Sequence, residues 1–244
     1  MPKRTLNEVH TAVEAGPPHA PAPVTARCGA SRSGARRRHS ARPQAAQWRE
    51  ELQAGILERQ DWGAREPDHD AENETGFYGP DNPEGWRVYE GDLRAIYRTV
   101  VVHHSVLYET DDPGTMRAIQ QQHMELRGWA DIAYHFGVGQ SAQVFAGRPL
   151  NVRGTHVEGF NTGSVGVVFL GDFSLNVPAP AQIEAGRRLI DWLALRLELT
   201  HLAGHSDFNS GTDCPGQYLQ EVLGALAESA GLALGTGGYV PDQV

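Results

Sequence analysis

The sequence has few of the features that would place it in a membrane or in a disulfide-rich class. A transmembrane helix needs about 18 uninterrupted apolar residues, and no stretch of the sequence approaches that length. Only two cysteines occur, Cys28 and Cys214, which excludes a disulfide scaffold. Lysine is nearly absent, with Lys3 the single example. The 244 residues, 40% of them hydrophobic, are enough for one globular domain with a sizeable core and an additional segment.

The formal net charge of -9 is unevenly distributed. Residues 1–50 hold nine Lys+Arg and three Asp+Glu, whereas residues 51–244 hold twelve and 27. The first part therefore carries a net charge of +6 and the second -15. This division predicts a basic tail joined to an acidic domain.

Residues 1–46 are predicted to be a disordered basic tail, because prolines punctuate an Ala- and Arg-rich stretch without periodicity. Its basic cluster Arg36–His39 suits either a contact with nucleic acid or an anionic envelope polymer, or a solvated tail. Nucleic-acid binding is not expected, since the remaining domain, residues 47–244, is acidic. The start of the chain lacks the apolar stretch of a signal peptide, and the sequence leaves open where the protein acts.

Strand and helix patterns alternate through the predicted domain, which favours an α/β fold: a central mixed β-sheet flanked by helices. Apolar β-rich runs predict strands over 96–105 and 165–173, and a hairpin is expected from 132–139 and 144–147. Helical spacing predicts helices over 48–57, 115–127, from Pro180 to Leu197, and after Cys214-Pro215-Gly216.

Three segments carry residues suited to metal chemistry. His103 and His104 end the first apolar strand, His205 is expected in a loop after a long helix, and Cys214 is expected at the N-cap of the last helix. A helix N-terminus lowers the pKa of a thiol, and two imidazoles with one thiolate leave an open position for water on zinc. The wide spacing leaves an alternative open, in which each histidine is buried and satisfied by hydrogen bonds and the cysteine is inert.

Motifs along the domain add a second line of argument. They are Trp62–Ala64, Val102–Ser105, Gly128–Phe136, Val144–Arg148, Gly154–His156, Gly159–Asn161, Ser164–Gly171, Gly204–Asp207 and Asp213–Gly216. In this order they resemble the type 2 N-acetylmuramoyl-L-alanine amidases and the related peptidoglycan recognition proteins, over about residues 56–228.

The resemblance implies that His103, His205 and Cys214 hold Zn²⁺ and that Tyr134 and Thr212 assist catalysis. It implies hydrolysis of the amide between the lactyl group of N-acetylmuramic acid and L-alanine, in peptidoglycan or in muropeptides. His104, His156 and Asn161 are the implied substrate-binding residues, although His104 could instead support its neighbour. The interval from His205 to Cys214 is one residue longer than the family's commonest spacing, which affects the expected place of Thr212 most.

A competing hypothesis is a peptidoglycan-binding module that recognises its ligand without cleaving it. Recognition proteins of that kind commonly lack the cysteine, whereas this sequence has Cys214 together with both histidines and Tyr134. The enzyme is therefore the favoured prediction, acting as a monomer without a membrane span. The type of stem peptide is left open.

Overall fold

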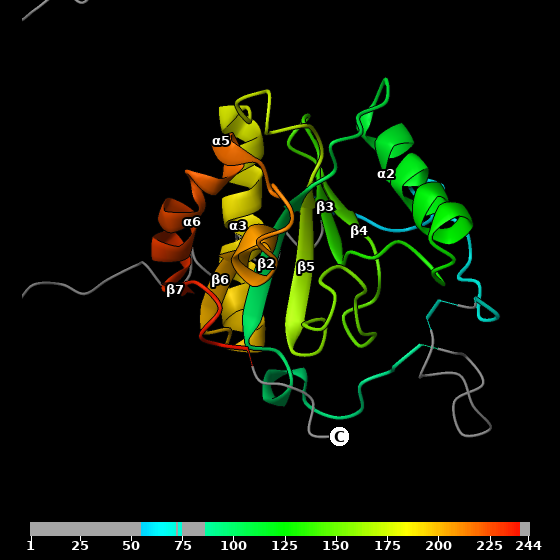
Figure 1. Ribbon diagram of the computed structural model, residues 1–244, viewed down its shortest axis with the longest axis horizontal. Helices are drawn as coiled ribbons and strands as arrows, with labels where there is room; N and C mark the ends of the chain where they lie inside the picture. The colour runs from blue at the N-terminus through cyan, green and yellow to red at the C-terminus, as the bar shows by residue number, and fades with distance from the viewer. Residues whose placement is uncertain (1–54, 72, 75–85, 240–244) are drawn as a thin grey trace, which may run out of the picture. The chain divides into compact units, whose positions relative to one another are not determined.

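The computed structural model describes residues 55–71, 73–74 and 86–239. In these residues seven strands form one mixed sheet in the order β1-β4-β3-β5-β2-β6-β7 (Figure 1). The predicted α/β fold with a central mixed sheet and flanking helices is thereby confirmed. The predicted tail, residues 1–46, and Cys28 lie outside the described residues.

The strands are β1 (Ile56–Leu57), β2 (Thr99–His104), β3 (Phe136–Val138), β4 (Val144–Ala146), β5 (Ser164–Phe169), β6 (His201–Gly204) and β7 (Ala233–Leu234). The β3–β4 hairpin is the antiparallel pair, and the other named pairs are parallel. Every residue of β2 and β5 is buried. Their continuous apolar runs are typical of parallel strands covered on both faces.

The helices are η1 (Leu93–Ala95, 3₁₀), α2 (Asp112–Gln121), η2 (Gln122–Leu126, π), α3 (Pro180–Leu197), α4 (His205–Phe208), α5 (Gln217–Gln220) and α6 (Leu223–Ala230). Asp111 caps α2 by accepting a hydrogen bond from Gly114 N–H, and Pro180 opens α3. Within the described part of the chain, no helix is both long and apolar enough to cross a bilayer.

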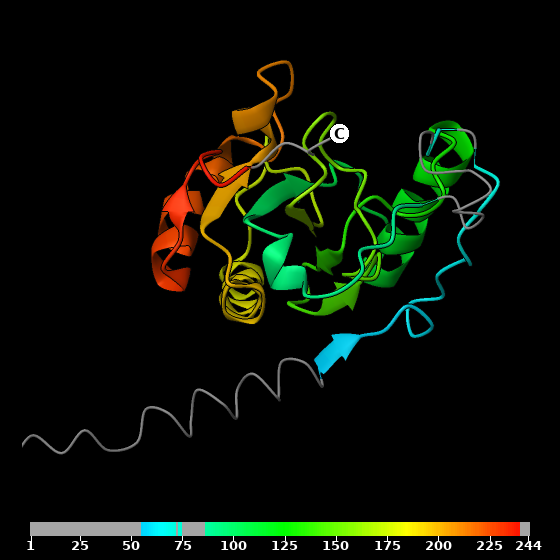
Figure 2. The ribbon, with the colours of Figure 1, turned by 90° about the horizontal axis from the view of Figure 1, so that it is seen from below.

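Two apolar clusters hold the layers together. Leu189, Leu193 and Leu223 from α3 and α6 pack with Val100 and Val102 of β2, alongside other core residues. A second cluster joins Met116 and Ile119 of α2 to Trp62 and Val168. Figure 2 shows α3 and α6 well separated from α2 across the sheet. Because strand side chains alternate, His103 points away from the cluster that contains Val102.

Short elements differ from the sequence predictions. Ile56 and Leu57 form an edge strand on β4 and not the end of a helix, while residues 48–54 of that predicted helix are not described. The strands β6 and β7 were not predicted, and the last helix is divided into α5 and α6. Strands of two to four residues carry too little periodicity to be recognised, and pairing with a neighbour decides them.

Candidate metal centre

Three side chains from separate segments meet at the carboxyl ends of the sheet's strands. One ligand atom from each of His103, His205 and Cys214 lies within 4.8 Å of the other two. His103 is the penultimate residue of β2, and the parallel neighbour β6 ends at Gly204. The site therefore forms where two paired strands end. His205 opens the helical turn α4, so the sequence prediction of a loop at this residue was wrong.

Burial keeps both imidazoles of this group neutral. Desolvation lowers the pKa of His103 well below its usual range, and the nearby His156 and His205 lower it further. Desolvation also lowers the pKa of His205. A neutral imidazole keeps a lone pair available for a metal ion, so both residues are in the protonation state that coordination requires.

Cys214 does not cap a helix as the sequence predicted. Helix α5 begins at Gln217 with Gly216 as its N-cap. Burial raises the pKa of the Cys214 thiol to about 12, and the hydrogen bond that His104 N–H donates to Sγ, at 3.4 Å, lowers it only in part. The helix end therefore does not activate this thiol, and a bound cation would have to favour the thiolate.

The donor set fits zinc. Zinc lies about 2.1 Å from nitrogen and about 2.3 Å from sulfur, so tetrahedral N and S ligands stand about 3.6 Å apart. The distance between His103 Nδ1 and Cys214 Sγ is 3.6 Å. Two imidazoles and a thiolate are also the ligand types that zinc accepts, with one tetrahedral position left over.

His156 lies behind the metal centre and contacts His103 directly. Its Nδ1 is 3.0 Å from His103 Nε2, and its own Nε2 is 3.4 Å from the carbonyl oxygen of Ser164. The His103 ring thus presents one nitrogen to Cys214 and the other to His156. The sequence prediction of a substrate contact for His156 stays a prediction, although the residue borders the cavity described next.

A cavity of about 310 Å³ opens above these residues. Tyr134 lines it, with its ring centroid 5.0 Å from that of His103, and burial raises the pKa of its phenol well above 10. The phenol is therefore a neutral hydrogen-bond donor at physiological pH. Thr212 also lines the cavity; its Oγ1 accepts a hydrogen bond from Cys214 N–H at 3.2 Å, which leaves the hydroxyl proton free to donate.

The other two predicted substrate-binding residues differ in position. His104 lines the cavity, and its Nδ1 accepts a hydrogen bond from Phe173 N–H at 3.2 Å. Asn161 is buried, and its Oδ1 accepts hydrogen bonds from the backbone of His156 and Val157 at 2.6 and 2.8 Å. Asn161 thus stabilises the loop that carries His156, and its predicted contact with substrate stays a prediction.

The comparison with known families decides the affiliation of the chain. Residues 93–217, about half of the chain, match the family described as N-acetylmuramoyl-L-alanine amidase. The chain belongs to this amidase family.

Peptidoglycan recognition proteins are among the relatives of this amidase-family chain. Peptidoglycan-recognition protein LB of Drosophila melanogaster is 34% identical over 174 residues, which cover 68% of this chain and 66% of that protein. A mutant of Drosophila PGRP-LB in complex with tracheal cytotoxin is 31% identical, with a TM-score of 0.55, covering 68% of this chain and 92% of that one. Human PGRP-IBETAC in complex with glycosamyl muramyl pentapeptide is 26% identical, with a TM-score of 0.56, covering 69% and 93%.

Sequence reasoning missed several residues of the cavity in this amidase-family domain. Trp129 is only partly buried and lines the cavity, with its ring centroid 4.9 Å from that of His123. Arg127 also lines the cavity and adds a positive charge. Arg127 directly follows η2, and Trp129 comes two residues later, so the turn around Gly128, whose φ is 66, was the available signal.

Proposed function

We propose that this chain is a zinc-dependent N-acetylmuramoyl-L-alanine amidase. Its reaction would hydrolyse the amide between the lactyl group of N-acetylmuramic acid and L-alanine in peptidoglycan or muropeptides. The observation that carries the proposal is the convergence of His103, His205 and Cys214, with ligand atoms within 4.8 Å of one another, beside the cavity that Tyr134 lines.

The residues have distinct tasks in this proposal. When bound, zinc supplies a Lewis acid that polarises the amide carbonyl and acidifies water. Tyr134 donates a hydrogen bond to the oxygen on which negative charge develops, because its raised pKa keeps the proton on the phenol. Thr212 offers a second, uncharged donor whose oxygen is held by Cys214 N–H.

The solved relatives support a muropeptide as the ligand. Two of them hold tracheal cytotoxin and glycosamyl muramyl pentapeptide. By similarity we infer that the cavity of this chain takes a muropeptide, with Arg127 available to a carboxylate of the peptide.

The alternative function is recognition of peptidoglycan without cleavage. Zinc analysis and an assay on cell-wall sacculi and soluble muropeptides separate the two functions. The enzyme is expected to carry zinc and to release new L-alanine amino termini. Zinc-loaded protein that releases none contradicts the amidase and favours the recognition module.

The variant Cys214→Ser sharpens this test. It is expected to abolish turnover while sacculus binding largely persists, because the thiol belongs to the metal centre, whereas many other residues line the cavity. Loss of binding together with turnover would instead indicate that the metal has a structural role.

A further inference from the structure

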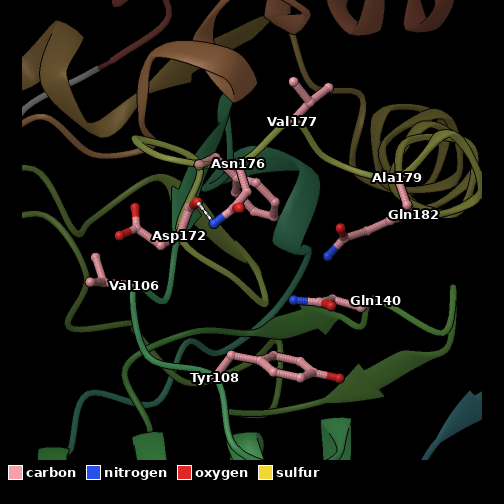
Figure 3. A pocket seen from close by; sticks show the side chains of 9 residues that line it. Val106, Tyr108, Gln140, Asp172, Asn176, Val177, Ala179 and Gln182 are labelled. Atoms are coloured by element: carbon pink, nitrogen blue, oxygen red, sulfur yellow. Dashed lines mark hydrogen bonds between the residues drawn. The ribbon is translucent and has the colours of Figure 1, made fainter.

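A second cavity, of about 450 Å³, is shown in Figure 3. It lies beside the first cavity, because Val106 lines both. It is lined by residues that follow β2, β5 and β3, namely Val106, Asp172 and Gln140. These three strands are neighbours and run parallel, so the cavity sits at their carboxyl ends. Open α/β sheets bind ligands at the carboxyl ends of their strands. The volume of this cavity also falls in the range of about 300–1,000 Å³ that is typical of small-molecule sites.

Val106 borders both cavities. Its φ is 59, and Leu107 N–H donates to Ser105 O across it at 2.6 Å. A β-branched residue in the left-handed region is strained, and such outliers concentrate at ligand sites. Val106 is 58% exposed. Its side chain forms an apolar wall between the two cavities, despite the energetic cost of its backbone conformation.

The lining of the second cavity is polar but nearly uncharged. The amides of Gln140 and Asn176 are exposed in it, and the buried Gln182, whose Nε2 donates to backbone carbonyls, offers its amide oxygen; Figure 3 shows Gln140 and Gln182 extending into the cavity. Asp172 is its one charged residue among the described side chains, and no lysine or arginine lines it there. Amides both donate to and accept from hydroxyl and acetamido groups, whereas a free carboxylate would find no cation.

Apolar surface completes the cavity. The ring of Tyr108 is 39% exposed, and Val177 is 73% exposed. Both lie in the loops that follow β2 and β5. A flat aromatic face beside neutral amides complements a sugar ring, which has apolar C–H faces and hydroxyl edges.

The walls are held in place before any ligand binds. Tyr108 donates its phenolic proton to Asp112 Oδ1 at 3.1 Å, and the same oxygen accepts from Gln140 N–H at 2.9 Å. Gln182 Nε2 donates to Val138 O and Leu170 O at 3.0 and 3.1 Å. Such a preformed site loses little conformational entropy when it binds.

We propose that this second cavity binds a sugar residue of the glycan strand next to the muramic acid whose amide is cleaved. The inference rests on the proposed amidase function, because that bond joins a sugar to a peptide and the substrate must continue as glycan beyond it. The shared Val106 wall places the second cavity next to the first. The expected ligand is a neutral N-acetylated sugar.

Filling the cavity tests the inference. Ala179 lines it, is exposed and has extended backbone angles, so Ala179→Trp inserts a large ring without backbone strain. Leu175→Trp is the matched control, since Leu175 is 76% exposed in the same loop and is not among the lining residues. Gln140→Ala is a second variant that only removes an exposed amide.

Calorimetry with a stem-free tetrasaccharide of alternating N-acetylglucosamine and N-acetylmuramic acid gives a readout independent of hydrolysis. Wild type and Leu175→Trp are expected to bind it alike, and Ala179→Trp at least about tenfold more weakly, equivalent to about 1.4 kcal/mol. Gln140→Ala is expected to bind it more weakly than wild type. A wild type that does not bind, or two cavity variants that bind as wild type does, would overturn the inference.

Hydrolysis gives the second readout. With zinc-loaded protein, kcat/KM is compared for disaccharide and tetrasaccharide muropeptides with the same stem. Wild type and Leu175→Trp are expected to prefer the longer glycan, and Ala179→Trp is expected to lose that preference. If wild type cleaves the disaccharide and tetrasaccharide muropeptides with equal kcat/KM, the proposal that the second cavity binds a sugar of the substrate is contradicted. A wild type that cleaves neither substrate contradicts the amidase itself, and calorimetry then still decides whether the cavity binds glycan.

Discussion

His103 Nε2 lies 3.0 Å from His156 Nδ1, and this contact connects the metal centre to the sheet. For His103 Nδ1 to face Cys214 with a free lone pair, the ring proton must be on Nε2, from which it is donated to His156. His156 then carries its own proton on Nε2, 3.4 Å from Ser164 O. The chain of hydrogen bonds ends on the backbone of β5, so the sheet orients the His103 ring.

This relationship predicts that His156 controls zinc affinity. Because outer partners of metal-bound histidines set ring orientation, His156→Ala should weaken zinc binding by about 10–100-fold. His156→Gln supplies a carbonyl acceptor for His103 and should recover part of the loss. The measurement is chelator competition on the full-length protein, which does not depend on turnover. Equal zinc affinity in wild type and His156→Ala would contradict the role.

Tyr134 should act on turnover and not on metal binding. Tyr134→Phe removes the hydroxyl but keeps the ring that packs 5.0 Å from His103. Loss of one donor to a developing oxyanion costs about 10²–10³ in kcat. Kinetics on a muropeptide together with zinc analysis check this expectation. A variant with normal zinc content and normal kcat would remove Tyr134 from the chemistry.

Gly166 in β5 leaves room for the His156 ring. A Cβ at this position would lie 2.5 Å from His156 Cδ2. Overpacking of this kind costs about 1–3 kcal/mol, so Gly166→Ala should lower the free energy of unfolding by that amount. Gly224→Ala in α6 is the control, because a Cβ there meets nothing within 4 Å and alanine favours helix. Urea unfolding of both variants, compared with wild type, gives the two values.

His135 predicts how stability depends on pH. Its Nδ1 accepts from Gly166 N–H and its Nε2 donates to Val152 O, both at 3.0 Å, so the ring is neutral. Burial lowers its pKa to about 4, below the 6.5 of the unfolded chain. The neutral ring contributes about 3 kcal/mol to the free energy of unfolding. This contribution is fully present above pH 6.5 and is lost as the pH falls toward 4.

Urea unfolding of the metal-free protein between pH 8 and pH 4 measures this loss. His135→Gln removes the titrating group and should show a weaker pH dependence than wild type, even if it is less stable overall. Burial lowers the pKa of His123 to about 3, so its protonation should also destabilise the protein as the pH falls. Unfolding free energies that stay constant down to pH 4 would show that these rings do not titrate as expected.

The parts of the fold that sequence predicted well have strong local patterns. The apolar runs of β2 and β5 and the apolar stripe of α3 after Pro180 are all present. Short strands such as β6 have no such pattern and form only because β2 offers a partner. The predicted N-cap at Cys214 failed because Gly216, two residues later, caps the helix.

By itself, the sequence determined which residue types could bind zinc and, through its motifs, which family it resembles. Only the tertiary structure decided that His103 and His205, 102 positions apart, stand next to each other, because parallel pairing of β2 and β6 brings their ends together. It also decided which nitrogen of His103 faces Cys214 and that burial keeps the histidines neutral. Contact, orientation and desolvation depend on packing between distant segments, and local sequence does not encode them.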